Sequence, residues 1–306
     1  MRICQPLSTQ KTAQKPAIAS DLGIQTKDAC RHLNKDMING PMNKRKRHKT
    51  GRSITTPQPS RRSASGTWLY GRHACVAALM NPKRQVNRFV LTRNADSDLD
   101  IPVGEKTMEA EIVDRQTIES FLPADCVHQG IAVLVSPLPH VGLHETVSAL
   151  NESSRAVFLI LDQANDPRNI GAILRTAAAF GVSGVILPDR GTPEESGALA
   201  KAAAGALETL PMFRVTNLVR TMEEMKEHGF WCVGVDGYAE LELSEIDFTG
   251  RIVIALGAEG KGLRRLTRET CDHLGKISIS HAMESLNLSN AAAITLYEIS
   301  RQQGKK

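Results

Sequence analysis

The sequence lacks any apolar run that approaches the roughly 20 residues a helix needs to span a bilayer. Its first residues also lack the apolar core of a secretory signal peptide. Hydrophobic content of 41% beside 23% charged residues is typical of a globular protein. We therefore expect no contact with a membrane and a cytoplasmic location.

Clustered cysteines are also lacking. The six cysteines are scattered, with no CxxC pair and no Cys/His cluster of the kind that binds zinc. We expect free thiols in a reducing compartment and no bound metal. Cys75, Cys232 and Cys271 lie in apolar segments, which predicts that they are core residues.

The usual nucleotide-binding fingerprints are missing too. The segment Ile252–Gly262 reads IVIALGAEGKG, with Gly257, Gly260 and Gly262 around Glu259. It has neither the spacing of GxGxxG nor the GK[ST] ending of a P-loop. It also follows a late strand, whereas a Rossmann-type enzyme carries its glycines after the first one. The loop is either a plain turn or a place where the backbone approaches a ligand closely.

The net charge of +5 hides an asymmetry between a basic tail and a mildly acidic body. Residues 1–64 hold 14 Lys/Arg and 3 Asp, while the remainder holds 24 Lys/Arg and 30 Asp/Glu. Residues 1–65 are polar and without apolar periodicity, so we expect a disordered tail. Its basic cluster Asn43–Lys49 is an RNA-binding arm, a nuclear address or a solubilising tail, and the sequence does not choose among these.

A small α/β domain is expected over residues 66–136, followed by a linker at 137–154 that includes a short helix, His144–Leu150. The expected strands are Asn87–Thr92, Ala110–Val113 and Gly130–Val135, and the expected helices are Gly71–Leu79 and Arg115–Phe121.

Residues 155–306 alternate strands with helices, which predicts a doubly wound parallel sheet. The expected strands are Val157–Leu161, Gly184–Leu187, Met212–Val215, Phe230–Val235, Arg251–Leu256 and Lys276–Ile279. The expected helices are the one that carries Arg175, then Glu194–Ala204, Asn217–His228, Gly262–Asp272 and Asn290–Gln302.

The stretch Val157–Asp189 organises this part of the chain. Asp166-Pro167 is a helix start, with Asp as N-cap and Pro in the first helical position. Asn169 lies in the first turn, where Asn is a mediocre helix former. Either this is one strand-helix-strand unit with a solvated arginine face, or Asn169 and Arg175 look into a site at the carboxyl ends of the strands.

A third polar segment opens the last helix and reads ESLNLSN from Glu284. Ser289 is the expected N-cap of that helix. Ser285 and Asn287 would then precede the cap, in a loop where their side chains are free to bind a ligand.

Three segments in this order, NDPRNIGAILRTAAAFG, ALGAEGKGL and ESLNLSNAAAI, resemble the three motifs of the SpoU (TrmH-like) branch of the SPOUT RNA methyltransferases. The resemblance covers residues 66–306 and is greatest to the RlmB type, which methylates guanosine 2′-hydroxyls in 23S rRNA. KAAAGALETLPMFRVTNLVRTM and EGKGLRRLTRETCDHL support that type. One departure is the loop SISHAMESLN, which is about two residues shorter than is usual in the family.

The resemblance implies a fold that the pattern alone does not give. The sheet would carry a C-terminal trefoil knot, and the small domain would be L30e-like and bind RNA. The resemblance also implies S-adenosylmethionine as cofactor and a homodimer whose active sites borrow residues from both subunits.

The site residues implied by the resemblance fall into two groups. Arg175 would bind the target phosphate and assist removal of the 2′-hydroxyl proton. Asn169, Glu259, Ser285 and Asn287 would complete the catalytic site. Gly257, Ile279 and Leu286 would hold the cofactor's adenine. The alternatives are a tRNA guanosine-2′-O-methyltransferase and a non-catalytic RNA-binding ribosome-assembly factor.

The last helix gives an argument for a dimer from the residues themselves. Its apolar side chains surround the helix instead of forming one stripe, so it should be buried on more than one side. We expect Ile299 on the side that faces a second subunit.

Overall fold

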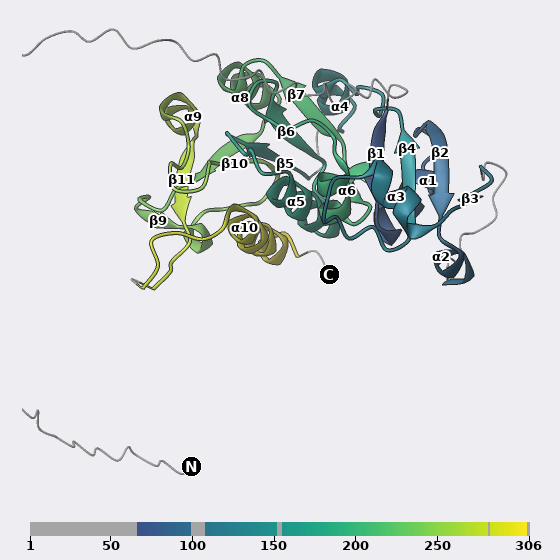
Figure 1. Cartoon of the computed structure of the whole chain (residues 1–306). Coiled ribbons are helices and arrows are strands. Elements are labelled where there is room, and N and C mark those ends of the chain that lie inside the picture. Colours follow the sequence, from purple (N-terminus) through teal and green to yellow (C-terminus); the bar gives the residue numbers. More distant parts are fainter. Residues whose placement is uncertain (1–65, 99–107, 152–154, 281, 305–306) are drawn as a thin grey trace, which may run out of the picture. The chain divides into compact units, whose positions relative to one another are not determined.

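A computed structural model of the chain describes residues 66–98, 108–151, 155–280 and 282–304. The expected disordered tail, residues 1–65, lies outside these ranges. The described residues form two β-sheets with helices around them (Figure 1).

The smaller sheet has four strands in the order β1-β4-β2-β3. Strand β4 pairs antiparallel with β1 and β2, and β3 pairs parallel with β2. The strands are β1 (Thr67–Tyr70), β2 (Val86–Leu91), β3 (Glu111–Ile112) and β4 (Ile131–Val135), and the helices are α1 (Arg72–Met80), α2 (Arg93–Asp98) and α3 (Arg115–Phe121). Three strands were expected here. The fourth, β1, is four residues long and was missed because so short a run shows no periodicity.

The larger sheet has seven strands in the order β7-β6-β5-β10-β8-β11-β9, and every pair is parallel. Its strands are β5 (Ala156–Leu161), β6 (Gly184–Pro188), β7 (Met212–Val215), β8 (Trp231–Val235), β9 (Leu241–Glu242), β10 (Arg251–Leu256) and β11 (His273–Lys276). The expected doubly wound parallel α/β fold is therefore confirmed.

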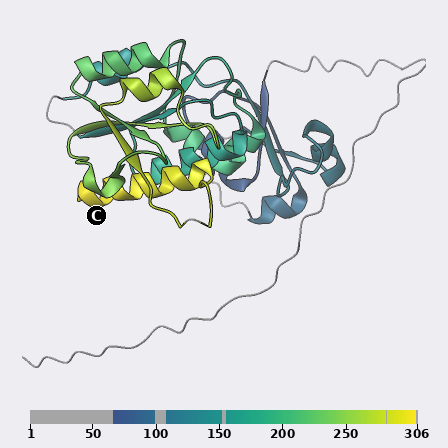
Figure 2. The same ribbon diagram turned by 90° about the vertical axis from the view of Figure 1, so that its left-hand side faces the viewer.

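Helices cover both faces of the larger sheet, as the two views in Figures 1 and 2 show. On β5, Val157, Leu159 and Leu161 pack into the layer of α5 (Pro167–Ala179) and α10 (Leu288–Gln302). Phe158 and Ile160 pack into the layer of α8 (Leu218–Glu227). Alternate side chains of one strand thus enter opposite cores, which explains its unbroken apolar run.

The remaining helices are short. They are α4 (Leu143–Ser148), α6 (Gly197–Ala203), α7 (Ala206–Thr209), the 3₁₀ turn η1 (Leu243–Glu245) and α9 (Arg265–Thr270). Several expected boundaries were wrong, and β9 and α2 were not expected. The helix expected over Gly262–Asp272 is α9 (Arg265–Thr270), and the strand expected over Lys276–Ile279 is β11 (His273–Lys276). Helix α6 begins at Gly197 instead of Glu194, because Ser196 caps it by accepting from the Leu199 amide at 3.3 Å. Strand β11 ends at Lys276, where its partner β9 also ends, so residues 277–279 are not in a strand.

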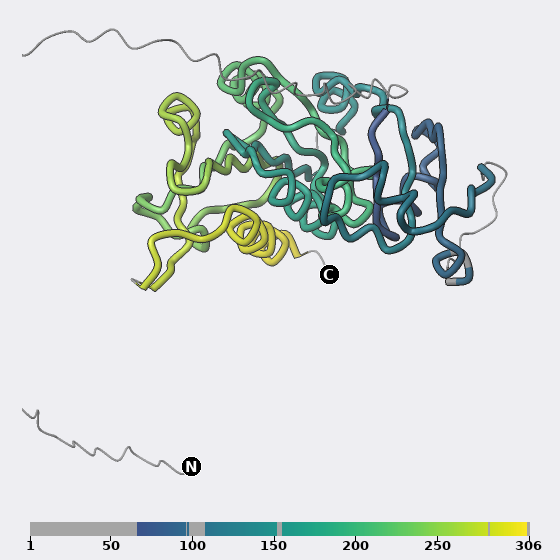
Figure 3. The backbone as a smooth tube through the Cα atoms, in the orientation of Figure 1, coloured from purple at the N-terminus to yellow at the C-terminus, as the bar shows by residue number. Residues whose placement is uncertain are grey.

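The order of the strands places a switch point between β5 and β10. From β5 the chain runs outward through β6 and β7, then crosses to the other side of β5 to form β8. The tube in Figure 3 lets the reader follow this crossing. In open α/β sheets, ligands bind where the strand order reverses, outside the carboxyl ends of the strands. Here that crevice lies between the loops that follow β5 and β10.

A buried ion pair links the smaller sheet to the helices of the larger one. Arg84, just before β2, lies 2.7 Å from the Glu208 carboxylate on α7 and 2.9 Å from that of Glu195. The Arg84 side chain is fully buried. Burial alone would lower the pKa of its guanidinium, but hydrogen bonds and charge from Glu208 and Glu195 outweigh burial and raise that pKa.

The described cysteines are all free thiols, as expected. Burial raises the pKa of Cys232 and of Cys271 to about 12, so both stay protonated at neutral pH. Within the described ranges, no helix is long and apolar enough to cross a membrane. The same ranges hold no group of three or more His, Cys, Asp or Glu side chains placed to bind a metal.

Candidate active site

The first turn of α5 follows directly from the residues that start it. The side chain of Asp166 accepts a hydrogen bond of 2.9 Å from the Arg168 amide, and Pro167 occupies the first helical position. This start was expected from the sequence and is observed. It fixes Asn169 at the carboxyl end of β5, beside the switch point of the sheet.

Three residues from distant parts of the chain converge on one carboxylate oxygen. Glu259 Oε1 accepts hydrogen bonds from Asn169 Nδ2 at 2.7 Å, from Asn287 Nδ2 at 2.9 Å and from the Leu288 amide at 3.2 Å. Asn287 Nδ2 also donates to Asn169 Oδ1 at 3.2 Å. Since both amide nitrogens donate to Glu259 and Asn169 Oδ1 accepts from Asn287, the amide groups of both asparagines have a fixed orientation. We call Asn169, Glu259 and Asn287 the amide–carboxylate cluster.

Asn287 also starts α10. Its Oδ1 accepts from the Ser289 amide at 2.8 Å and from the Ser289 hydroxyl at 2.6 Å, which makes Asn287 the N-cap. The expectation that Ser289 caps the helix was wrong. Asn and Ser are about equally good N-caps, so the local sequence could not show whether Asn287 or Ser289 caps the helix.

Glu259 lies at the tip of a tight loop after β10. The main chains of Ala258 and Gly262 pair across this loop at 3.1 and 2.9 Å. A Cβ atom on Gly257 would lie 2.0 Å from the Gly262 carbonyl carbon, so only glycine fits at that position. Gly257 therefore lets the chain approach itself, and this closure holds the Glu259 carboxylate toward α5 and α10.

Arg175 is not part of the amide–carboxylate cluster in the described chain. It is exposed, and the described residues offer its side chain no hydrogen bond or ion pair. It follows Asn169 by six residues, so the two side chains lie about 120° apart around the helix. Arg168, seven residues before Arg175, is exposed on the same face, as expected.

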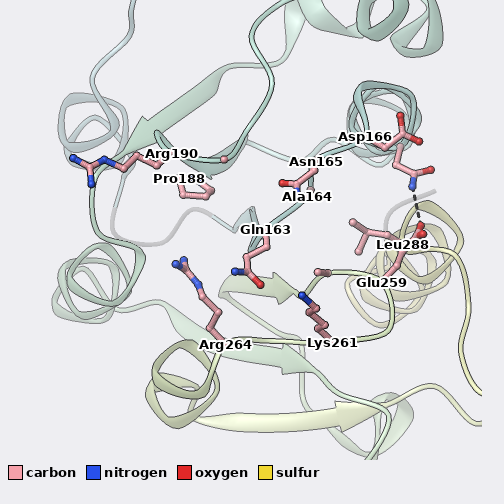
Figure 4. A pocket seen from close by; sticks show the side chains of 13 residues that line it. Gln163, Ala164, Asn165, Asp166, Pro188, Arg190, Glu259, Lys261, Arg264 and Leu288 are labelled. Atoms are coloured by element: carbon pink, nitrogen blue, oxygen red, sulfur yellow. Dashed lines mark hydrogen bonds between the residues drawn. The ribbon is translucent and has the colours of Figure 1, made fainter. Parts of the chain in front are cut away.

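A cavity of about 460 Å³ lies in the crevice beside the cluster (Figure 4). Its wall is built by the loops after β5, β6 and β10. Besides Asn169 and Glu259 it includes residues that the sequence analysis missed: Gln163, Arg190, Lys261 and Arg264. Their place in the loops at the carboxyl ends of β5, β6 and β10 was the signal that could have found them.

A second cavity, of about 530 Å³, lies where the chain passes from β11 to α10. Ile277, Ile279 and Leu286 give it apolar walls, and Ser278 and Ser285 add hydroxyl groups. Such a lining suits a ligand with a flat apolar ring and polar ends. Two of the three expected cofactor residues line this cavity, together with Ser285. The third, Gly257, is not among its lining residues.

Comparison with known proteins identifies the family. The model of the SpoU rRNA methylase family matches residues 156–297. A model described as RNA 2′-O ribose methyltransferase substrate binding matches residues 68–141. Among solved structures, the SpoU methyltransferase AviRb from Streptomyces viridochromogenes, in complex with AdoMet, superposes with a TM-score of 0.63 at 22% identity, over 78% of this chain and 90% of AviRb. At that identity the likeness shows the fold alone.

Several curated relatives are closer in sequence. The 23S rRNA (guanosine-2′-O-)-methyltransferase RlmB of Haemophilus ducreyi is 40% identical over 240 residues, which cover 77% of this chain and 97% of RlmB. RlmB of Vibrio vulnificus is 39% identical, with 78% and 98% covered. An uncharacterized tRNA/rRNA methyltransferase of Synechocystis is also 39% identical, but this chain spans only 62% of its length. With a family model over the larger sheet and relatives covered almost end to end, the chain belongs to the SpoU family of RNA 2′-O-ribose methyltransferases.

Proposed function

We propose that this protein transfers a methyl group from S-adenosylmethionine to the 2′-hydroxyl of a guanosine in 23S rRNA. The observation that carries the proposal is the amide–carboxylate cluster at the switch point, beside one polar cavity and near a second, more apolar one. The RlmB relatives, which the chain covers almost completely, carry out this reaction by name.

The second cavity fits the cofactor. Ile279 and Leu286 supply apolar walls for an adenine ring, and Ser285 supplies a hydroxyl for a polar end. S-adenosylmethionine brings a methyl group already activated on a sulfonium, so no metal is required. Gly257 acts indirectly, because it lets the loop that carries Glu259 close on itself.

The chain's own residues position the ribose. A 2′-hydroxyl is a weak nucleophile, and holding it in line with the methyl group contributes several kcal/mol by preorganisation. Asn169 and Asn287 both donate to one carboxylate oxygen of Glu259, which leaves its other oxygen and the second hydrogen of Asn169 Nδ2 for the substrate. The guanidinium of Arg175 would orient the phosphate beside the hydroxyl and stabilise developing negative charge.

Arg175 reaches the site from a second subunit. In the single chain it is exposed on α5 and apart from the amide–carboxylate cluster. Helix α10 packs against α5 and leaves Ile294 and Tyr297 exposed, at 42% and 61%. A symmetric homodimer through these two helices would cover both side chains and bring Arg175 to the partner's cluster. Ile299, which was expected on this outer side, is 2% exposed and packs inside its own chain, so that expectation was wrong.

Finer features of the architecture belong to the same proposal. The chain would carry a C-terminal trefoil knot in residues 155–306, and an L30e-like RNA-binding domain in residues 66–136 joined by the linker 137–154. The disordered basic tail of residues 1–65 would add RNA affinity, and the protein would work in the cytoplasm without a metal.

Mapping of 2′-O-methyl groups in 23S rRNA and in tRNA, with and without the gene, tests the function. We expect one guanosine in 23S rRNA to lose its methyl group. Loss of a tRNA methyl group would make the protein a tRNA methyltransferase instead. An unchanged map, together with RNA binding by the purified protein but no transfer of labelled methyl groups, would make it a non-catalytic assembly factor.

A further inference from the structure

The cavity beside the amide–carboxylate cluster has two chemically different ends. Figure 4 shows Asp166 and Glu259 at one end, and Arg190 and Arg264 at the other. Lys261 lines the same cavity. Glu259 is held by the two asparagines, and Asp166 caps α5. In the part of the chain that the structure describes, neither Arg190 nor Lys261 has an ion-pair partner.

Arg264 differs from the other two cations because a buried carboxylate anchors it. Asp162 directly follows β5 and is completely buried. Its Oδ2 accepts a hydrogen bond from the Arg264 amide at 3.1 Å, and its Oδ1 forms an ion pair of 2.6 Å with Arg264 Nε. Asp162 is itself fixed, since its amide donates to the Leu256 carbonyl at the end of β10 at 2.8 Å.

Asp162 contacts the main chain and Nε of Arg264, so the two Nη groups remain available for a ligand. Asp162 holds the main chain by a hydrogen bond and Nε by charge alone, since its Oδ1 accepts no hydrogen bond within the described residues. Nη1 and Nη2 have no partner among those residues. The side chain is 46% exposed, so these donors reach the solvent of the cavity. A guanidinium held at Nε presents its two Nη groups as a fork, which matches two oxygens of a phosphate.

We propose that Arg264 binds a backbone phosphate of the substrate RNA next to the target ribose, and that Asp162 is the positioning residue that aims it. This inference rests on the proposed function, since it names the RNA contact at the same site. The ribose would lie at the end of the cavity formed by the amide–carboxylate cluster, and the phosphate at the end formed by Arg190 and Arg264.

Salt-dependent RNA binding separates a phosphate contact from other roles of Arg264. With an unmodified 23S rRNA transcript as probe, Arg264→Ala should bind about tenfold more weakly at low salt. It should also reduce the slope of log K against log[salt] by roughly 0.7 to 0.9, the value for one phosphate. Arg265→Ala is the matched control, because Arg265 is exposed and pairs with Glu269 at 2.8 Å outside the cavity. That variant should leave the RNA affinity nearly unchanged.

Asp162→Asn tests the positioning role, because loss of positioning and loss of negative charge should change the RNA affinity in opposite directions. Asparagine keeps the size and an acceptor for the Arg264 amide, but it removes a negative charge near the RNA. If Asp162 only added charge, the variant would bind RNA more tightly. We expect weaker binding, and no further loss when Asp162→Asn is combined with Arg264→Ala. Cofactor affinity should stay at the wild-type value in each variant, which also reports that the fold is intact.

Four outcomes would overturn the inference while leaving the proposed function standing, provided that the wild-type protein methylates the transcript. They are an unchanged salt slope for Arg264→Ala, a loss of preference for guanosine without a change in slope, weaker binding of S-adenosylmethionine, and tighter RNA binding by Asp162→Asn. A wild-type protein that neither binds nor methylates the transcript would instead overturn the proposed function itself.

Discussion

Asn287 lies 118 residues beyond Asn169 in the sequence, yet its side-chain amide donates a hydrogen bond of 3.2 Å to the side-chain oxygen of Asn169. Both amides also donate to the same oxygen of Glu259. The contact joins the start of α5 to the start of α10, with the loop after β10 between them. The cluster therefore forms only when the switch point of the sheet is complete.

Asn287 has two functions that one substitution separates. Asn287→Ser keeps an oxygen that caps α10 but removes the amide that reaches Glu259 and Asn169. We expect kcat to fall by at least about tenfold, since lost positioning is costly, with little change in stability. Asn287→Ala should lose the same activity and also about 1 kcal/mol of stability, because the cap is gone.

Single-turnover assays and thermal unfolding of the two variants check this separation. If Asn287→Ser turned over at the wild-type rate, the amide donor would have no part in catalysis. If Asn287→Ala unfolded at the wild-type temperature, the cap would contribute nothing to the fold.

Arg175→Ala should abolish methyl transfer with the fold and cofactor affinity preserved, because the side chain is exposed and forms no hydrogen bond or ion pair with the described residues. Mixing it with Asn169→Ala tests where Arg175 acts. If Arg175 serves the partner's site, an equal mixture of the two inactive variants should recover about a quarter of the wild-type activity, since half of the dimers then hold one intact site. If Arg175 serves its own chain, the mixture should stay inactive. Near-wild-type turnover by Arg175→Ala alone would remove it from catalysis.

Local chemistry was sufficient to predict the start of α5 from the sequence. Asp166 and Pro167 act on neighbouring residues, so cap and helix were predicted together. The same holds for α8, which was expected over Asn217–His228 and spans Leu218–Glu227, with Asn217 as N-cap and His228 as C-cap. Both helices were predicted because their ends depend on side chains within a few residues.

The remaining features depend on contacts between distant segments. Residues 277–279 alternate like a strand, but β11 ends where its two-residue partner β9 ends, and Ile277 and Ile279 line a cavity instead. Glu195 looked like part of a helix, but it pairs with Arg84 from the smaller sheet. The anchoring of Arg264 by Asp162 likewise needs β5 and β10 to be neighbours, which 102 residues of separation conceal.

The buried pair of Arg84 and Glu208 makes a strong prediction about stability. The Glu208 side chain is 3% exposed, so Arg84→Ala would leave a buried carboxylate without its counter-ion. We expect a loss of roughly 3–5 kcal/mol in the free energy of unfolding. The double variant Arg84→Met/Glu208→Leu should be less destabilised, because the more deeply buried carboxylate is removed with Arg84 and only Glu195, whose side chain is 19% exposed, loses its ion pair.

Denaturant unfolding measures these differences, with Arg220→Ala as control. Arg220 pairs with Glu224 on the surface of α8 and is 78% exposed, so its loss should cost less than about 1 kcal/mol. Equal effects of Arg84→Ala and Arg220→Ala would show that the buried pair contributes no more than a surface pair.

The outer face of α10 provides the test of the dimer. Tyr297 and Ile294 are 61% and 42% exposed, although both are large apolar side chains on a helix whose other side is already buried by Leu296 and Ile299. Exposed apolar area of this kind marks a surface that another protein covers. Tyr297→Glu should place a charge in that interface, whereas Leu266→Glu adds the same charge at a 53% exposed leucine on α9.

We expect Tyr297→Glu to sediment as a monomer with little methyl transfer, because Arg175 would no longer reach a partner's cluster. Leu266→Glu should remain a dimer with wild-type activity. Analytical ultracentrifugation at micromolar concentration, followed by methylation assays on the same samples, checks both statements. Ile299→Glu is unsuitable for this purpose, because Ile299 is buried in its own chain. A carboxylate at that position would destabilise the fold and so mimic the loss of a dimer. A wild-type protein that sediments as a monomer and still methylates RNA would exclude a site shared between subunits.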